Sequence, residues 1–355
     1  MSDADLRFGL IGCGHIARRH AELLGTGQVD GATLTAVCDI VPERAQTLGE
    51  QYDVPHFTDL REVLARDDVD VACILTPSGL HHDHALAAAA AGKHVLVEKP
   101  MALRLDHADS MIRACDEAKV RLFVVKQCRF NVPVRRAREA LDDGRFGTPL
   151  SGSARLWWRR DQDYYDQAPW RGTWALDGGV LMNQAIHHID LLQWFLGPAN
   201  SVRAAGRTAL LDIEVEDSAV ATVTFANGAL GVIDATTATR PRSVEGSVSI
   251  LGSGGTVEIG GVAADRLVNW EFCEKIDSDD RPLDDFSNPA GAAGYGHKSY
   301  YDEVVKALRG EESAAVDGRE GRQSLALVTA LYAAMESGET VSLDSGAAHS
   351  RLGRG

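Results

Sequence analysis

The sequence lacks the features that mark several classes of protein. Its 355 residues include only six cysteines, and none of these forms a Cys-x-x-Cys pair, so we expect reduced, buried thiols instead of disulfides or a metal site. No apolar run approaches the roughly 18 residues of a membrane span, and the N-terminus has no signal-peptide pattern. We therefore expect a cytoplasmic protein with no membrane partner. The cysteines are Cys13, Cys38, Cys73, Cys115, Cys128 and Cys273.

Basic residues are also scarce. Lysine and arginine number 36 against 51 acidic residues, which gives a net charge of -15. A nucleic-acid binder usually presents a basic face, so no nucleic-acid partner is expected. Any anionic ligand must then be met by local arginine, lysine or a helix N-terminus. The length suggests two domains, because one domain usually takes about 100–200 residues.

Strand-like and helix-like segments alternate in the first third of the chain. Short apolar runs at 6–11, 34–38, 71–75, 95–97 and 122–125 are separated by segments of helical spacing. This alternation predicts an α/β fold with a doubly wound parallel sheet over residues 1–126. The part from 127 to 355 starts with helical patterns at 133–141 and 181–196. Thr- and Val-rich strands follow, with a hairpin signal at Asn227-Gly228, which predicts an α+β domain with a mostly antiparallel sheet.

A Gly-x-Gly-x-x-Ala fingerprint follows the first strand. Gly12 permits a tight turn, Gly14 lets the backbone approach a pyrophosphate, and Ala17 allows close packing of helix on strand. Asp39 ends the next strand, 22 residues after Ala17. A carboxylate there binds a ribose diol and repels a 2′-phosphate, so NAD is favoured over NADP. The alternatives are a turn that binds nothing and an Asp39 that caps a helix or lies on the surface.

Three further segments carry a specific resemblance. They are Thr76-Pro77-Ser78-Gly79-Leu80-His81, the run from Ala91-Gly92-Lys93-His94 to Glu98-Lys99-Pro100, and the run from Gly178-Gly179 to His187-His188-Ile189-Asp190. Together with the fingerprint they resemble the glucose–fructose oxidoreductase / inositol dehydrogenase / rhizopine-catabolism (Gfo/Idh/MocA) family. The segments Tyr164-Tyr165-Asp166 and Trp170-Arg171-Gly172-Thr173-Trp174 are similar to those of its UDP-N-acetyl-glucosaminuronate 3-dehydrogenase branch.

The resemblance implies an NAD-dependent enzyme that oxidises a CH–OH group of a sugar. It implies a large open sheet in the second domain, a homodimer or homotetramer, and, for the branch, a nucleotide-sugar substrate on the way to surface polysaccharides. Lys99 would polarise the reacting hydroxyl and His187 would be the general base. The family pattern has Asp where this chain has Asn183, four residues before His187, so Asn183 could orient a partner but cannot take a proton.

The resemblance and the motifs together name two further sets of residues, and no metal ligand. The predicted cofactor-binding residues are Gly12, Cys13, Gly14, His15, Ile16, Asp39, Thr76, Pro77, Ser78, His81, Glu98, Lys99, Gln127, Trp170 and Arg171. The predicted substrate-binding residues are Lys99, Arg129, Tyr164, Tyr165, Arg171, Thr173, Asn183, Gln184, His187 and His297.

Several alternatives stay open at this point. Zinc binding by His81, His82 and His84, or by His187 and His188, competes with the catalytic interpretation. The aromatic residues near Arg171 could belong to a loop and a core. A dehydrogenase of a free sugar or inositol, and a non-catalytic NAD-sensing regulator, are the two rival functions.

Overall fold

The computed structural model describes residues 5–289, 294–343 and 350–354. The chain divides into two compact units: Met1–Gln127 with Gly296–Arg322, and Cys128–Tyr295 with Gln323–Gly355. The sequence predicted a single division near residue 126, so the return of 296–322 to the first unit differs from that expectation.

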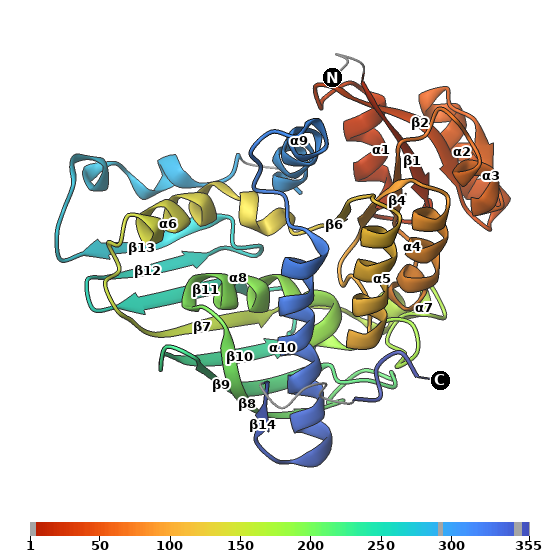
Figure 1. Cartoon of the computed structure of the whole chain (residues 1–355). Helices are drawn as coiled ribbons and strands as arrows, with labels where there is room; N and C mark the ends of the chain where they lie inside the picture. The colour runs from red at the N-terminus through yellow and green to blue at the C-terminus, as the bar shows by residue number, and fades with distance from the viewer. Residues whose placement is uncertain (1–4, 290–293, 344–349, 355) are drawn as a thin grey trace. The chain divides into compact units, whose positions relative to one another are not determined.

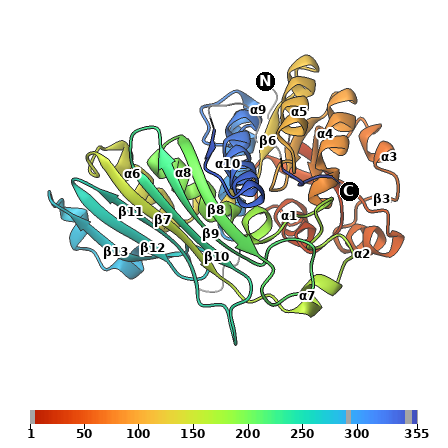
Figure 2. The ribbon, with the colours of Figure 1, turned by 90° about the horizontal axis from the view of Figure 1, so that it is seen from below.

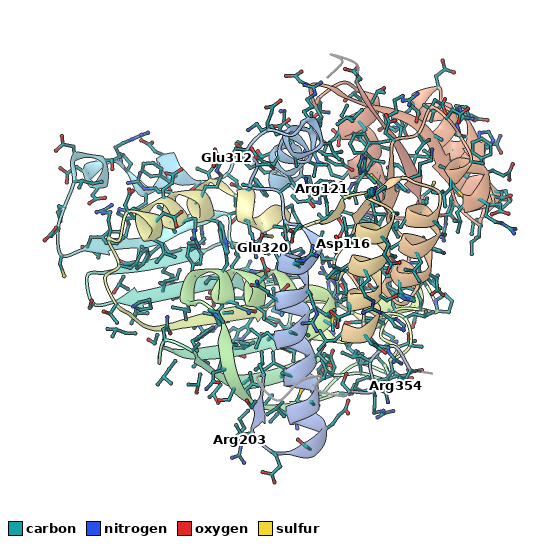
Figure 3. The ribbon with its side chains drawn as sticks, viewed as in Figure 1. Asp116, Arg121, Arg203, Glu312, Glu320 and Arg354 are labelled. Atoms are coloured by element: carbon teal, nitrogen blue, oxygen red, sulfur yellow. The ribbon has the colours of Figure 1, made fainter. Side chains whose placement is uncertain are left out.

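Contacts between distant parts of the chain explain this return. Tyr301, on α9 (Gly296–Arg309), packs edge-on against Phe8 with ring centroids 5.6 Å apart. Arg319 forms an ion pair with Asp116 at 2.6 Å, and Asp116 is labelled in Figure 3. No local sequence pattern signals either contact, because the partners are far apart in the sequence.

The first unit contains a six-stranded parallel sheet in the order β3-β2-β1-β4-β5-β6 (Figure 1). The chain reverses its direction of strand addition between β1 and β4, which is where open α/β sheets bind ligands at the carboxyl ends of their strands. The strands are β1 (Leu6–Ile11), β2 (Ala32–Cys38), β3 (His56–Phe57), β4 (Val71–Ile74), β5 (His94–Val97) and β6 (Leu122–Val124).

Helices connect these strands, as the alternating pattern predicted. Leu10 and Ile11 of β1 point to opposite faces of the sheet and are 0% and 2% exposed, because a parallel sheet is covered on both faces. The predicted doubly wound fold is therefore confirmed. The helices are α1 (Ala17–Gly25), α2 (Pro42–Tyr52), α3 (Leu60–Leu64), α4 (His81–Ala90), α5 (Leu105–Glu117) and α9, with 3-10 turns at Ser78–Leu80 and Gln127–Phe130.

The second unit contains an eight-stranded sheet in the order β13-β12-β11-β7-β10-β9-β8-β14. Its neighbouring strands are antiparallel except for the parallel pair β7 and β10. The predicted mostly antiparallel sheet is thus confirmed. The strands are β7 (Pro149–Trp157), β8 (Ala199–Arg207), β9 (Ser218–Phe225), β10 (Leu230–Thr236), β11 (Glu245–Gly252), β12 (Gly255–Gly260), β13 (Arg266–Phe272) and β14 (Val341–Ser342).

Helices cover one face of this sheet. α8 packs on β7 and β11, and α6 packs on β12 and β13 (Figure 2). The opposite face exposes apolar side chains, among them Val220, Leu230 and Val232. Among the described residues, no helix combines the length and the apolar character needed to cross a bilayer. The helices are α6 (Val132–Asp142), α7 (Gln162–Asp166), α8 (Ile186–Leu196) and α10 (Gly318–Ser337), with 3-10 turns at Asp277–Asp280 and Leu283–Phe286.

The helix predicted over 181–196 is interrupted. A π-helical turn covers Val180–Gln184, and α8 begins only at Ile186. Asn183 and His187, four residues apart, therefore do not share one regular helical face. By contrast, the hairpin at Asn227-Gly228 is confirmed, with Gly228 at φ 89° in the turn that joins β9 to β10.

Candidate active site

The two glycines of the fingerprint serve different purposes. Gly12 has φ 99°, and a Cβ there would lie 2.8 Å from the backbone of Leu75, so the fold itself requires this glycine. A Cβ on Gly14 would meet no atom within 4 Å among the described residues. The packing of the described residues thus leaves room at Gly14, just before the start of α1, and contact of this turn with a pyrophosphate stays a prediction.

This difference gives a prediction. Gly14→Val should weaken NADH binding by roughly 10- to 100-fold, because overpacking costs about 1–3 kcal/mol. The melting temperature should stay near that of the wild type, since the new side chain meets no protein atom. NADH fluorescence titration and thermal denaturation measure the two quantities. The matched variant Gly12→Ala should instead lower the melting temperature. Unchanged NADH affinity in Gly14→Val would remove the argument for a pyrophosphate at this turn.

Asp39 braces the same turn. Its carboxylate accepts hydrogen bonds from the backbone N–H of Cys13 at 2.7 Å and of Val41 at 2.9 Å. Asp39 is only 9% exposed, and the N-cap of α2 is Val41. The alternatives of a surface aspartate or a helix cap are therefore wrong. Contact of Asp39 with a ribose stays a prediction.

The thiol of Cys13 lies in the fingerprint turn, close to Asp39. Burial, with Asp39 close by, raises its pKa to about 12, so it stays protonated and is a poor nucleophile. Cys38, Cys73 and Cys115 are buried as predicted, whereas Cys273 is exposed just beyond β13. The general expectation of buried thiols is thus wrong for Cys273.

Two turns follow the carboxyl ends of β4 and β5. Thr76, Pro77 and Ser78 follow β4. Glu98, Lys99 and Pro100 follow β5, with a cis peptide bond between Lys99 and Pro100. Both turns therefore lie at the edge of the sheet where the fingerprint turn also lies. Gln127 starts the 3-10 turn after β6 at the same edge.

His81 joins these two turns. One ring nitrogen lies 2.8 Å from the carbonyl of Pro100 and the other 2.8 Å from the carbonyl of Thr76. The side chain is 1% exposed, and burial lowers its pKa. The structure thus gives His81 a role inside the first unit, and a direct contact with the cofactor stays a prediction.

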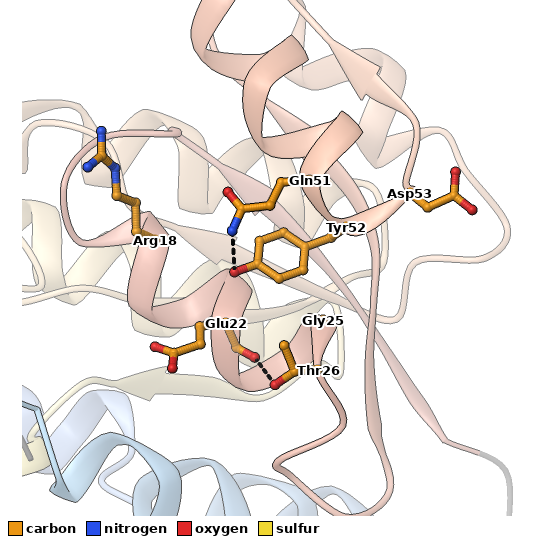
Figure 4. Close-up of a pocket in the computed structure, with 7 residues that line it drawn as sticks. All are labelled: Arg18, Glu22, Gly25, Thr26, Gln51, Tyr52 and Asp53. Atoms are coloured by element: carbon orange, nitrogen blue, oxygen red, sulfur yellow. Dashed lines mark hydrogen bonds between the residues drawn. The ribbon is translucent and has the colours of Figure 1, made fainter.

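A broad groove lies at the other ends of α1 and α2. It has a volume of about 780 Å³ and is lined by residues that include Glu22, Thr26 and Tyr52 (Figure 4). These residues lie at or near the C-termini of the two helices, whereas the fingerprint turn precedes the N-terminus of α1. Arg18, in the first turn of α1, also lines the groove, and none of the lining residues is among the predicted cofactor-binding residues.

In the second unit, Glu216 organises the π-helical turn. Its Oε1 accepts hydrogen bonds from the Leu181 N–H at 3.0 Å and the Tyr332 hydroxyl at 2.7 Å. A Cβ on Gly179 would lie 2.2 Å from Oε2, which explains the glycine there. The sequence analysis missed Glu216, because an acid 35 residues away from Leu181 carries no local signal.

Burial raises the pKa of Glu216 to about 7 from 4.5, even though Leu181 and Tyr332 donate hydrogen bonds to it. The folded protein therefore holds a proton that the unfolded chain loses between about pH 4.5 and 7. The stability contributed by protonated Glu216 is present below that range and is lost as pH rises to 7, by roughly 3 kcal/mol. Glu216→Gln should remove this component, which urea unfolding at pH 5 and pH 8 measures. An equal pH dependence in both proteins would contradict this assignment.

Asp177 and Asn183 also lie in this part of the second unit. The amide of Asn183 donates to Oδ1 of Asp177, and Oδ2 accepts from the Gly172 N–H at 2.8 Å. The sequence predicted Asn183 as a substrate ligand, and the structure gives it an internal partner in addition. Gln184 is buried in the same turn. Their contacts with substrate stay predictions.

The aromatic–basic segment forms a stacked cluster. The guanidinium of Arg171 lies 4.2 Å from the ring centroid of Tyr164 and 4.7 Å from that of Trp170, and it also donates to the Tyr164 hydroxyl. Thr173 donates to the carbonyl of Trp170 at 2.8 Å. Residues 170–174 do lie in turns, as the loop interpretation has it, and the rings of Tyr164 and Trp170 flank the half-buried guanidinium there. Tyr165 is 4% exposed, so its predicted substrate contact has little surface available.

The neighbouring histidines of α8 differ sharply. His188 packs edge-on against Trp158, and burial lowers its pKa to about 4. His187 is 8% exposed on the next position of the helix, where side chains point about 100° apart. His188 is therefore a core residue, and His187 stays the predicted base.

Arg129 has a buried partner. Its guanidinium forms a two-pronged pair with Asp190, at 2.7 and 3.0 Å, and lies over the ring of Trp194 at 4.8 Å. The sequence predicted a substrate ligand at Arg129. The structure shows that two of its donors serve Asp190, and a substrate contact stays a prediction.

His297 lies in the first unit, although the sequence assigned it to the second domain. It is 3% exposed and lies with His20 and Glu98 in a group whose ligating atoms are all within 4.8 Å of one another. The sequence analysis did not connect these three residues. The zinc candidates it weighed, among His81, His82, His84, His187 and His188, do not appear as a group among the described residues.

The parallel sheet, its switch point and the open space at Gly14 define a dinucleotide-binding oxidoreductase. Residues 6–126 match the oxidoreductase family with an NAD-binding Rossmann fold, and residues 134–258 match the GFO/IDH/MocA C-terminal domain. The chain therefore belongs to the Gfo/Idh/MocA family and uses NAD. The prediction of an NAD-dependent dehydrogenase is confirmed at this level.

Solved structures resemble both units. The chain is 43% identical to the WlbA dehydrogenase of Bordetella pertussis in complex with NADH and UDP-GlcNAcA, over 96% of this chain and 99% of that one, with a TM-score of 0.92. For the WlbA dehydrogenase of Chromobacterium violaceum the values are 42%, 96%, 97% and 0.90. A myo-inositol 2-dehydrogenase of Thermotoga maritima is 29% identical over 96% of this chain and 99% of its own length.

Proposed function

We propose that this protein oxidises the 3-hydroxyl of a UDP-N-acetyl-glucosaminuronate-like nucleotide sugar with NAD. The observation that carries the proposal is the 43% identity to a WlbA dehydrogenase whose structure contains NADH and UDP-GlcNAcA, with 96% of this chain covered. Such an enzyme would supply a keto sugar for surface polysaccharides. The alternative, a dehydrogenase of a free sugar or inositol, draws on the 29% identity to myo-inositol 2-dehydrogenase.

The residues of the second unit suit an anionic nucleotide sugar. The chain has a net charge of -15, so a uronate or pyrophosphate needs local cations. Arg171, stacked between Tyr164 and Trp170, offers a pre-oriented fork for such an anion. Arg160 also lies over the ring of Tyr164, at 4.8 Å. These aromatic faces additionally suit stacking of a uracil or nicotinamide ring.

Lys99 and His187 divide the proton chemistry in this proposal. The ammonium of Lys99 donates a hydrogen bond to the reacting hydroxyl and stabilises negative charge as it develops on that oxygen. His187 accepts the hydroxyl proton while the C–O bond becomes a carbonyl. When bound, NAD supplies the acceptor for the hydride that leaves the same carbon.

A substrate panel tests the proposal. NADH formation at 340 nm is measured with UDP-N-acetyl-glucosaminuronate, UDP-N-acetyl-glucosamine, glucuronate and myo-inositol. We expect turnover with the first compound and inhibition by UDP alone. The second compound is a matched control, because it differs only in lacking the carboxylate. Turnover of myo-inositol that UDP does not inhibit would favour the free-sugar enzyme. No turnover of any compound, with NADH still bound, would favour a regulator.

We further propose that the open face of the eight-stranded sheet forms a subunit interface. Val220 and Val232 are 55% and 50% exposed there, and apolar side chains grouped on a sheet face mark interaction surfaces. We expect a homodimer or homotetramer by light scattering. Val232→Lys should shift the protein toward smaller species, whereas Asp212→Lys, in an exposed loop outside the strands, should not. A monomeric wild type would contradict the interface.

A further inference from the structure

A buried polar network lies inside the first unit, next to the turn that carries Lys99. His20, Glu98 and His297 are 0%, 6% and 3% exposed. Oε1 of Glu98 lies 3.2 Å from Nε2 of His20 and 3.8 Å from Nε2 of His297. The three residues come from α1, from the end of β5 and from α9. Three separate segments thus converge on one carboxylate.

The hydrogen bonds of His20 fix its tautomer. A Glu98 carboxylate can only accept a hydrogen bond, so Nε2 of His20 carries the proton, and Nδ1 of the neutral ring accepts from the Tyr301 hydroxyl at 2.6 Å. The Nε2–H of His20 then donates to Glu98. Burial also lowers the pKa of His20, which keeps the ring neutral.

Glu98 is a charged carboxylate in this network. Burial alone would raise its pKa, but the hydrogen bond with His20 and the imidazole of His297 close by hold the pKa well below its usual value. Its second oxygen, Oε2, accepts the backbone N–H of Lys99 at 2.9 Å. One oxygen therefore anchors Glu98 to the interior, and the other holds the backbone of the next residue.

We propose that His20 and His297, through the Glu98 carboxylate, position Lys99 for hydride-transfer chemistry. This inference rests on the proposed role of Lys99. The Glu98 side chain spans the distance from the buried imidazoles to the Lys99 backbone, so removing an imidazole frees the carboxylate and the turn together. His20, Glu98 and His297 are positioning residues, and Lys99 remains the group that meets the substrate.

A divalent metal is the competing use of these ligands, since their atoms lie within 4.8 Å of one another. The hydrogen-bond interpretation is favoured because both oxygens of Glu98 and both nitrogens of His20 already have partners that match their donor and acceptor character.

The test compares His20→Leu, which removes the donor, with His20→Gln, whose amide restores a donor near the Nε2 position. His94→Leu is the control, because His94 starts β5 at the end opposite Glu98 and its Nδ1 accepts the Arg121 N–H. Two experiments are made on the NADH-loaded protein. Mass spectrometry follows the rate at which an anhydride acylates Lys99, and steady-state kinetics give kcat and KM. Lys93 provides the internal reference for acylation.

We expect His20→Leu to change the acylation rate of Lys99 relative to Lys93 several-fold. It should lower kcat by roughly 10- to 100-fold with little change in KM, as for a misplaced catalytic group. His20→Gln should bring both the acylation rate of Lys99 and kcat most of the way back to the wild-type values. His94→Leu should leave both at the wild-type values. If His20→Leu does not fold, Glu98→Gln, which keeps size and removes the charge, is measured in the same way.

Wild-type acylation of Lys99 and wild-type kcat in a folded His20→Leu or Glu98→Gln protein would overturn the inference. One equivalent of metal in the purified protein, lost in His20→Leu, would overturn it in favour of a metal site. The acylation readout needs no sugar. A failure of the proposed substrate, seen as no turnover by the wild type, is therefore distinguishable from a failure of the positioning network.

Discussion

Replacing Lys99 with methionine is expected to lower kcat by roughly 100- to 1,000-fold while NADH affinity stays near that of the wild type. The loss has this size because a donor aimed at a developing oxyanion stabilises the transition state more than the ground state. Methionine keeps the length of the side chain and removes its charge and its donors. Steady-state kinetics with the nucleotide sugar, together with NADH titration, measure the two effects.

Lys93→Met is the matched control for this variant. Lys93 precedes β5, and its ammonium donates to the carbonyl of Arg66 at 2.7 Å. Its loss should therefore affect stability slightly and leave kcat unchanged. An unchanged kcat in Lys99→Met would reject the assignment of Lys99, whereas a large loss of NADH affinity would make Lys99 a cofactor ligand instead.

Replacing His187 with asparagine should lower kcat by about 100- to 10,000-fold, the usual contribution of a positioned general base. Asparagine retains a polar group of similar reach but cannot accept a proton at neutral pH. Because His187 is buried, at 8% exposed, the melting temperature is measured as well, to separate a loss of stability from a loss of the chemical step. Pre-steady-state measurement of NADH formation isolates the chemical step from product release.

His188→Asn provides the opposite pattern. His188 is 2% exposed and packs against Trp158, so its replacement should lower the melting temperature while the surviving folded protein keeps its kcat. If His188→Asn abolishes turnover in the folded state and His187→Asn does not, the roles of the two histidines have been assigned in the wrong order.

Local sequence patterns predicted much of the structure of the first unit. The alternating apolar strands and helices follow patterns that span only a few residues, and the burial of a parallel sheet on both faces explains them. The hairpin at Asn227-Gly228 also follows a local pattern. Patterns of this kind also indicated NAD as cofactor, because one helix and one strand after the fingerprint place the Asp39 carboxylate at the end of β2.

Such patterns could not predict the π-helical turn before α8. The residues 181–196 have helical spacing, but the Leu181 N–H bonds to Glu216, which is 35 residues away, and Gly179 lies against the same carboxylate. The buried pair of Arg129 and Asp190 is a similar case, with 61 residues between its partners. Both regions hold residues that the sequence analysis had assigned to substrate, namely Asn183 and Arg129. In each region a contact with a distant residue determined the backbone conformation or the partner of the side chain.

By itself, the sequence determined the alternation of strands and helices in the first unit, the hairpin at Asn227-Gly228 and the dinucleotide turn, because these follow from local spacing, and its motifs carried the resemblance to the family. Only the tertiary structure decided that residues 296–322 belong with the first unit and that His20 and Tyr301, 281 residues apart, share a hydrogen bond beside Glu98. The physical reason is that a buried charge must find its partners wherever the folded chain brings them, and spacing along the sequence does not encode that encounter.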